Sequence, residues 1–262
     1  MLTHTSRGIK IAYLRRGAGT PLVLIHGYPL DHSIWNPILP RLEKDFEMIV
    51  PDLRGFGKST ISREEKVLTK RHNFSLIDLG EDIHDLLHSL GIKKAVLAGH
   101  SMGGYVALGY AQLHPEEVMG LGLIATQAAG DTAERKAGRY LSADQVDHNG
   151  VEEVAENMSK ALTSDPTLQE KMRGLILRQN KSTVANSLRA MAERPDASGF
   201  LPGFPFPLLI VQGLKDKIIP LERAFEMKEK ARKSYLVLIK EAGHLPMIEA
   251  PDETAEAIKI LK

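Results

Sequence analysis

The sequence predicts an α/β protein in which a mostly parallel β-sheet carries helices on both faces. Short apolar runs alternate with helical patterns along most of the chain, as in proteins built from strand–helix–strand units. Between about residues 127 and 204 the alternation stops, and only charged, helical patterns remain. We therefore expect a core formed by residues 1–126 and 205–262, with a helical cap, or lid, inserted at residues 127–204.

The strands are predicted where compact apolar runs end at glycine or a polar residue. The first run, residues 8–17, alternates at period two, and Arg7-Gly8 ahead of it has the composition of a hairpin turn. Six further runs lie at 21–27, 46–52, 94–100, 119–125, 206–213 and 235–243. Runs that are apolar throughout are typical of strands buried on both faces.

Helices are predicted between these strands, at about 33–44, 75–90, 102–113, 221–231 and 252–261. The second has the clearest end signals. Ser75 is placed as N-cap with Asp78 three residues later, close to a capping box, and Gly91 would end the helix. The charged segment 61–73 is expected to form an exposed loop or a short helix.

Composition excludes several classes of function. The 262 residues are 43% hydrophobic, enough for a sizeable core, and the formal charge is only +1, too little to hold nucleic acid or an anionic membrane. The absence of cysteine excludes disulfides, thiolate nucleophiles and zinc–thiolate sites. No apolar run approaches the roughly 18 residues of a membrane span, and residues 1–17 lack the apolar segment of a signal peptide. A cytoplasmic location is expected by default.

Residues 99–103, Gly-His-Ser-Met-Gly, match the G-x-S-x-G nucleophile elbow. The match follows the apolar run AVLA and precedes the helical run YVALGYAQL, as an elbow between strand and helix requires. Gly99 and Gly103 are needed because a β-carbon at either position would collide with neighbouring backbone around a strained serine. Ser101 is therefore the predicted nucleophile; the alternative is a small residue in a tight turn.

A serine nucleophile needs a base, and the base needs a group that fixes its tautomer. Among ten histidines, His244 is the predicted base, because it lies in a glycine-bounded loop after the last strand, at the carboxyl edge of the sheet. Asp216 is the predicted acid, since it follows a strand and lies between Ser101 and His244 in the chain. A turn aspartate is the alternative for Asp216, and His100 is expected to point away from the site.

An acyl-transfer site also needs N–H donors for the developing oxyanion. The elbow offers the N–H of Met102. The loop His26-Gly27-Tyr28-Pro29, after the predicted strand at 21–27, offers the N–H of Tyr28, with Gly27 allowing close backbone approach and Pro29 stiffening the loop. No metal and no organic cofactor are implied.

With these residues in this order, the chain resembles the α/β-hydrolase superfamily, and within it serine-triad carboxylesterases, arylesterases and cofactor-free haloperoxidases, or perhydrolases. The resemblance runs from about residue 8 to the C-terminus apart from the cap, and DLRGFGKS at 52–59 resembles a structural segment of the family. It implies an eight-stranded sheet and a serine hydrolase that cleaves small or short-chain esters with water, with a perhydrolase side activity suggested by His26–Pro29. Since related dehalogenases and epoxide hydrolases have aspartate where this chain has Ser101, neither reaction is expected.

Several alternatives share the same triad. They include a lactonase, another triad-using hydrolase, and a ligand sensor of the same fold that turns over slowly. The cap residues that would distinguish substrates are apolar at helical spacing, which is more typical of core than of pocket: Met158, Leu162, Leu175, Leu188 and Met191. Trp35 is likewise expected to be a packing residue. The sequence predicts no oligomeric state.

Overall fold

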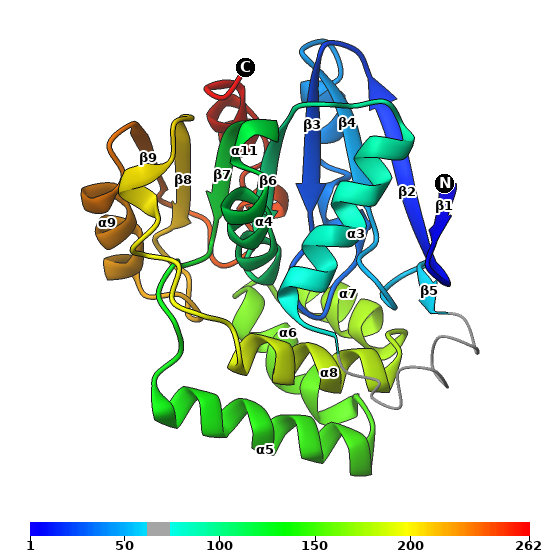
Figure 1. Ribbon diagram of the computed structural model, residues 1–262. Helices are drawn as coiled ribbons and strands as arrows, with labels where there is room; N and C mark the ends of the chain where they lie inside the picture. The colour runs from blue at the N-terminus through cyan, green and yellow to red at the C-terminus, as the bar shows by residue number, and fades with distance from the viewer. Residues whose placement is uncertain (62–73) are drawn as a thin grey trace.

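A computed structural model describes residues 1–61 and 74–262 and shows one sheet with helices on both faces (Figure 1). Along the sheet the strand order is β1-β2-β4-β3-β6-β7-β8-β9, and a two-residue strand, β5, pairs with β2 outside this path. The strands are β1 Leu2–Ser6, β2 Ile9–Gly17, β3 Thr20–Ile25, β4 Phe46–Pro51, β5 Thr60–Ile61, β6 Ala95–His100, β7 Val118–Ile124, β8 Leu208–Gly213 and β9 Ser234–Ile239. The predicted eight-stranded sheet is confirmed, with β5 as an addition, and residues 62–73 of the predicted loop lie outside the described residues.

Pairing is parallel from β4 across to β9 and antiparallel among β1, β2 and β4. The predicted hairpin joins β1 to β2. Arg7 and Gly8 have φ of 49° and 75°, the pair of positive values that a tight two-residue hairpin turn needs.

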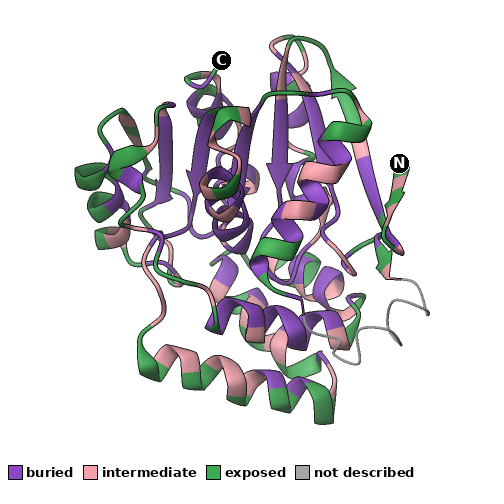
Figure 2. Ribbon diagram, in the orientation of Figure 1, coloured by how far each residue is buried: buried purple, intermediate pink, exposed green. Residues whose placement is uncertain are grey.

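Each parallel strand contributes side chains to two separate cores. Val23 and Ile25 of β3 pack into the core on one face, while Leu22 and Leu24 pack into the core on the other. This alternation explains why the runs are apolar at every position: both faces of the sheet are covered, and the central strands are buried throughout (Figure 2).

One core lies under α3 (Leu76–Ser89), α4 (Met102–Leu113) and α9 (Leu221–Lys230); the other lies under α1 (Leu39–Leu42), α10 (Pro246–Glu249) and α11 (Pro251–Lys259). The start of α3 is the predicted capping box, with both Ser75–Asp78 bonds present. Gly91 follows the helix with φ 72°, as a terminating glycine does. Among residues 1–61 and 74–262, every helix is too short or too polar to span a bilayer.

The prediction of one helix over 33–44 is wrong. The segment forms a 3₁₀ turn, η1 (His32–Trp35), and the short helix α1. Pro37 and Pro40 explain the break, since proline lacks the N–H that a continuous helix would need at each position. Trp35 is fully buried in the core, which confirms its packing role.

Four helices lie between β7 and β8 in the chain: α5 Ala133–Asn149, α6 Glu152–Leu162, α7 Pro166–Leu177 and α8 Lys181–Ala192. As expected, no described strand falls in this segment. The four helices lie beyond the ends of the strands toward which the arrows of β3, β6 and β7 point (Figure 1). Short 3₁₀ turns, η2 (Pro115–Glu117) and η3 (Leu201–Gly203), precede β7 and β8.

A buried ion-pair network holds the start and the end of this helical segment together. The carboxylate of Asp131 is 1% exposed and accepts hydrogen bonds from Arg139 and from Arg194, the latter at 2.9 Å. Arg194 also lies over the ring of Tyr105 in α4, 4.1 Å from its centroid, so the network reaches the sheet-covering helices.

Asp131→Ala is expected to lower the free energy of unfolding by about 3–5 kcal/mol, because it leaves two arginines without their carboxylate inside the protein. The matched control, Asp144→Ala, removes a carboxylate that is 63% exposed and pairs with Arg189, and it should cost less than about 1 kcal/mol. Urea unfolding of the three proteins measures both values. Equal losses in the two variants would contradict this account of the network.

Candidate functional site

Ser101 lies on a sharp turn between β6 and α4. Its φ of 51° and ψ of −115° are strained for a residue with a β-carbon, and such backbone is typical of functional positions. Two hydrogen bonds hold it: its N–H donates to the carbonyl of Ile124 at 2.9 Å, and Thr126 Oγ1 donates to its carbonyl at 2.8 Å. Both partners belong to the neighbouring strand β7 or its end, so the sheet itself sets the strained turn.

The two glycines of the motif are required by close backbone approach. A β-carbon on Gly99 would lie 2.1 Å from the carbonyl oxygen of Gly103, and one on Gly103 would lie 2.3 Å from that of Ile25. Distances this short are not tolerated, so helix α4 can start this close to β3 and β6 only with glycine at both positions. The steric argument made from the motif is confirmed.

The structure brings Asp216 and His244 together in the loops after β8 and β9. His244 Nδ1 lies 2.8 Å from Asp216 Oδ2, and both side chains are 1% exposed. The other carboxylate oxygen accepts the N–H groups of Ile218 and Ile219 at 2.8 and 3.1 Å. Burial by itself raises the pKa of Asp216, but His244 and these N–H donors outweigh it and hold the pKa below its ordinary value. The ionised carboxylate therefore accepts a hydrogen bond from the Nδ1–H of His244, and Nε2 is the ring nitrogen that Asp216 does not engage.

Gln212 is a further support for this pair that the sequence analysis missed. Its side-chain amide donates to Asp216 Oδ2 at 3.0 Å from within the buried strand β8. A polar residue in the apolar run LLIVQG was the available signal, since a buried amide needs partners.

The loop that carries His244 is fixed by Glu249, a residue that sequence reasoning also missed. Glu249 Oε2 accepts the N–H groups of Gly243 and Leu245 at 2.8 and 3.2 Å, on either side of His244. Its other oxygen accepts the hydroxyl of Thr163, at the end of α6, at 2.6 Å. The same helix end contacts His244 directly, because the His244 N–H donates to the Leu162 carbonyl at 3.2 Å.

The expectation that His100 points away from the site is wrong. Its ring packs on that of His244 with centroids 4.8 Å apart, and its Nε2 donates to the His244 carbonyl at 2.7 Å. His100 is the last residue of β6, so this bond joins the histidine loop to the strand end that bears Ser101. Nε2 of His244 is buried and has no hydrogen-bond partner among the described residues.

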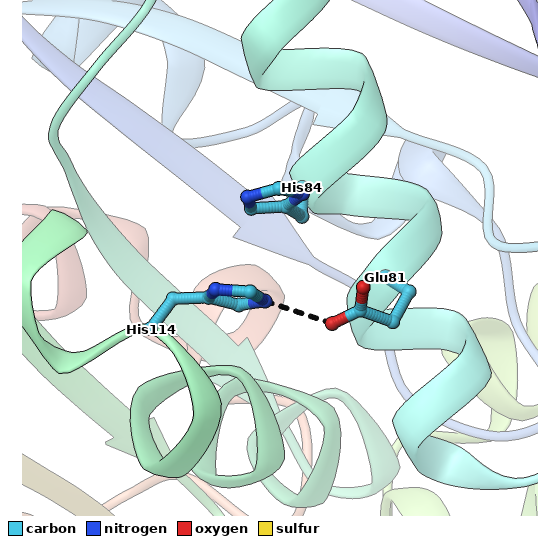
Figure 3. Close-up of side chains that lie close together, drawn as sticks. All are labelled: Glu81, His84 and His114. Carbon is cyan, nitrogen blue, oxygen red and sulfur yellow. Dashed lines mark hydrogen bonds and ion pairs between the residues drawn. The ribbon is translucent and has the colours of Figure 1, made fainter.

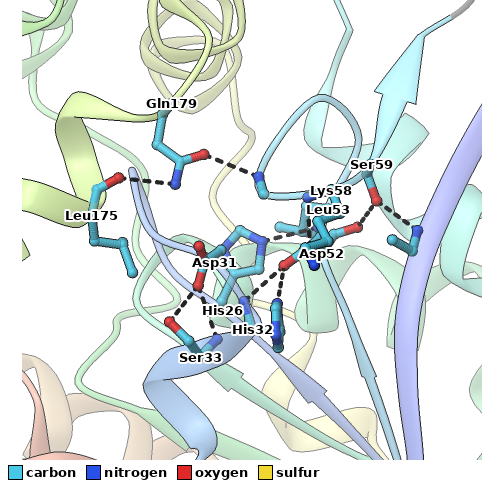
Figure 4. A network of polar contacts seen from close by, with 12 residues as sticks. His26, Asp31, His32, Ser33, Asp52, Leu53, Lys58, Ser59, Leu175 and Gln179 are labelled. Carbon is cyan, nitrogen blue, oxygen red and sulfur yellow. Dashed lines mark hydrogen bonds and ion pairs between the residues drawn. The ribbon is translucent and has the colours of Figure 1, made fainter. Parts of the chain in front are cut away.

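His26, at the start of the loop after β3, is a structural residue (Figure 4). Its Nε2 accepts the N–H of Leu53 at 2.9 Å and its Nδ1 donates to the Gly27 carbonyl at 3.0 Å, which fixes the tautomer. Gly27 also makes room for the His100 ring, since a β-carbon there would lie 2.5 Å from Nδ1 of His100. The Tyr28–Pro29 peptide is cis.

Asp52, in the segment DLRGFGKS, organises the neighbouring loops (Figure 4). Its carboxylate accepts the N–H and Nδ1–H of His32 at 2.9 and 2.7 Å and the N–H of Lys58 at 2.8 Å. Burial raises the pKa of Asp52, and His32 and the backbone donors outweigh that effect and lower it. With Asp31 these residues have a spacing that suits a metal ion, but the Asp52 oxygens are already taken by hydrogen bonds.

Two predicted oxyanion donors lie at the start of α4 and in the loop after β3. Met102 is the first residue of α4, so its N–H has no acceptor within the helix and lies at the positive end of the helix dipole. Tyr28 lines a cavity of about 150 Å³ together with residues of α5, α6 and α8, among them Val146, Met158 and Leu188. Leu162, Leu175, Leu188 and Met191 are buried core residues and Met158 packs against the core, as expected, while Met158 and Leu188 also line this cavity.

His100 should make the protein sensitive to acid. Burial, with the neighbouring His244, lowers the pKa of His100 to about 3, whereas an unfolded histidine titrates near ~6.5. Below about pH 6.5 the unfolded chain gains a proton that the folded chain does not take up. The free energy of unfolding therefore decreases as the pH is lowered, by at most about 1.4 kcal/mol per pH unit from this group.

We expect His100→Gln, which keeps a donor for the His244 carbonyl, to reduce that slope in urea unfolding between about pH 6.5 and 4.5. His148→Gln, an exposed imidazole on α5, is the control and should keep the slope of the unmodified protein. An unchanged slope in His100→Gln would show that the acid sensitivity comes from other groups.

Comparison with known proteins is consistent with this geometry. An esterase from Thermogutta terrifontis, solved with malate bound, is 36% identical and superposes with a TM-score of 0.90 over 98% of this chain and 95% of its own. Lipase 1 of Psychrobacter immobilis is 26% identical over 97% of this chain and 81% of its length. A pimeloyl-[acyl-carrier protein] methyl ester esterase of Vibrio vulnificus is 26% identical over 90% and 92%.

Residues 20–251 match the family model described as alpha/beta hydrolase fold. This range runs from β3 to the start of α11 and contains the serine elbow, the Asp216–His244 pair and all four inserted helices. The chain belongs to the α/β-hydrolase fold family.

Proposed function

We propose that this chain hydrolyses carboxylic esters through an acyl-enzyme on Ser101, with His244 as general base and Asp216 as the group that orients it. The chain is a carboxylic ester hydrolase, in keeping with its similarity to the Thermogutta esterase and the Psychrobacter lipase. The observation that best supports the triad is the buried Asp216–His244 pair, in which Nε2 of His244 has no hydrogen-bond partner among the described residues. The loop that carries His244 is hydrogen-bonded to His100, the residue directly before Ser101.

In the first half of the reaction, Ser101 Oγ attacks the ester carbonyl carbon while its proton passes to Nε2 of His244. The imidazolium is stabilised by the Asp216 carboxylate. The tetrahedral intermediate then expels the alcohol, which takes the proton from His244, and leaves an acyl ester on Ser101. In the second half, His244 activates water, which attacks the acyl group and releases the acid and the free serine.

The N–H groups of Met102 and Tyr28 are proposed to bind the negative oxygen of each tetrahedral intermediate. A backbone donor costs no reorganisation during the reaction, and the loss of one such donor typically raises the barrier by about 2.7 to 4 kcal/mol. The hydrogen bonds of His26 to Leu53 and Gly27 would hold the Tyr28 loop in place.

Residues 127–204 are proposed to act as a cap that shapes the substrate site. The cavity beside Tyr28 is lined by α5, α6 and α8 and is small and largely apolar, which favours a small or short-chain ester. Glu153 and Asn157 are the polar residues of this lining nearest in sequence to Met158, and they could select among esters by hydrogen bonding.

Ser101→Ala is expected to reduce kcat/KM for p-nitrophenyl acetate and butyrate by about 10³-fold or more, since the nucleophile is lost. Ser89→Ala, an exposed serine on α3, is the control and should keep full activity.

A panel with longer acyl chains, lactones and hydrogen peroxide as co-substrate, run on both variants, tests the substrate range and the predicted perhydrolase activity. Sustained turnover supports an enzyme, whereas one slow cycle that leaves a modified Ser101 would indicate a sensor.

Glu249→Gln is expected to lower kcat about tenfold with little change in KM. Three groups donate hydrogen bonds to the Glu249 carboxylate, and an amide can accept from only some of them, so the His244 loop becomes looser. Glu241→Gln, in the same loop but exposed and paired with Lys215, is the control. Steady-state kinetics with a short-chain ester separates the two constants. A rise in KM with kcat unchanged would place Glu249 in substrate binding instead.

A further inference from the structure

Three histidines and two glutamates gather on the outer face of α3 and α4, far from Ser101. His84 and His88 lie one turn apart on α3, His114 caps the C-terminal end of α4, and Glu117 follows in η2. Ser101 precedes the opposite end of α4, which is about 18 Å away along twelve residues of helix. The cluster therefore has no part in the proposed ester chemistry.

Three of these side chains converge on one point. Glu117 Oε1 lies 3.0 Å from Nε2 of His88 and 3.4 Å from Nε2 of His84. Ligands held at about 2.0–2.2 Å by a tetrahedral ion lie about 3.3–3.6 Å from one another. The His84 distance falls in that range, the His88 distance is slightly shorter, and all three atoms lie within 4.8 Å of one another, so a small shift would let them share one ion.

His114 and Glu81 form a second layer behind His84 (Figure 3). His114 Nε2 is bonded to Glu81 at 2.8 Å, and its ring stacks on that of His84 with centroids 4.1 Å apart and planes at 14°. Lone pairs of imidazole nitrogens lie in the ring plane, so two nearly parallel stacked rings cannot direct them at one ion, whereas the His84 and His88 rings, with centroids 4.2 Å apart, are tilted by 37°. His114 and Glu81 are therefore paired with each other and are not proposed ligands.

The surroundings favour a cation. Burial raises the pKa of Glu117, but the Tyr110 hydroxyl and the neighbouring histidines outweigh this and lower it, so the carboxylate stays charged. Tyr110 donates to the other oxygen, Oε2, at 2.5 Å, which leaves Oε1 facing the two imidazoles. The last turn of α3 and the C-terminal end of α4 both lie here, and helix C-termini carry partial negative charge.

We propose that His84 Nε2, His88 Nε2 and Glu117 Oε1 bind a divalent transition-metal ion such as Zn²⁺, with water as the fourth ligand. Two imidazoles and one carboxylate suit Zn²⁺, Cu²⁺ or Ni²⁺ rather than Mg²⁺ or Ca²⁺, which prefer oxygen ligands. Each imidazole would carry its proton on Nδ1 when Nε2 binds the ion. Because the ligands come from α3 and from the turn before β7, the ion would tie these two elements together.

Isothermal titration of untagged, chelator-treated protein with ZnCl₂ tests the proposal. We expect one Zn²⁺ per chain, and a rise in Tm of about 5 °C at a hundredfold excess over Kd, since the ion binds only the folded chain. His88→Gln should weaken binding at least about tenfold; this side chain is 55% exposed, so the variant should fold normally. Co²⁺ in place of Zn²⁺ should give the visible absorption of a tetrahedral site, and His88→Gln should lose it.

His114→Gln is the matched control, since it alters the stacked ring and no proposed ligand. It should keep one Zn²⁺ per chain with an affinity within about threefold of the unmodified protein. Failure of the unmodified protein to bind Zn²⁺ at micromolar concentrations would overturn the proposal, as would full binding by His88→Gln. Loss of binding in His114→Gln equal to that in His88→Gln would overturn the assigned ligand set. None of these readouts depends on ester hydrolysis.

Discussion

The position of His244 is fixed by hydrogen bonds from four separate parts of the chain. Asp216 holds the ring from the loop after β8, His100 holds the carbonyl from the end of β6, Leu162 accepts the N–H from the end of α6, and Glu249 holds the flanking N–H groups. A residue in a loop needs such bonds to keep one orientation, because a loop lacks the regular backbone hydrogen bonds of a helix or a sheet. The site therefore depends on the sheet and on the inserted helices at once.

The two-sided burial of the parallel strands explains why polar groups gather at one edge. Along the central strands most side chains pack into one of two apolar cores. Polar side chains lie mainly at the ends of the strands. Because they are still buried there, they need hydrogen-bond partners within the protein. His26 and His100 show the consequence: both are kept neutral, with burial lowering their pKa, and each joins two loops by hydrogen bonds.

Helix α4 connects the two sites proposed for this protein, and its dipole suits both. Its N-terminal end at Met102 carries partial positive charge, where a developing oxyanion would lie. Its C-terminal end at His114 carries partial negative charge beside the histidine–glutamate cluster, where a cation would lie. A metal ion at the C-terminal end would tie α3 to the turn that follows α4, and it would share no ligand with the serine site.

By itself the sequence determined the features that depend on local chemistry: the apolar strands, the Ser75 capping box, the Arg7-Gly8 turn, and the glycines around Ser101. It also indicated Asp216 and His244, because chain order and strand ends are visible in one dimension. Only the tertiary structure decided how distant residues meet. His100, Glu249 and Gln212 support His244 and Asp216, His84 and His88 meet Glu117, and Gly27 makes room for a histidine 73 positions away. Such contacts depend on how strands and helices pack, and packing between segments far apart in the chain leaves no periodic or motif signal in the sequence.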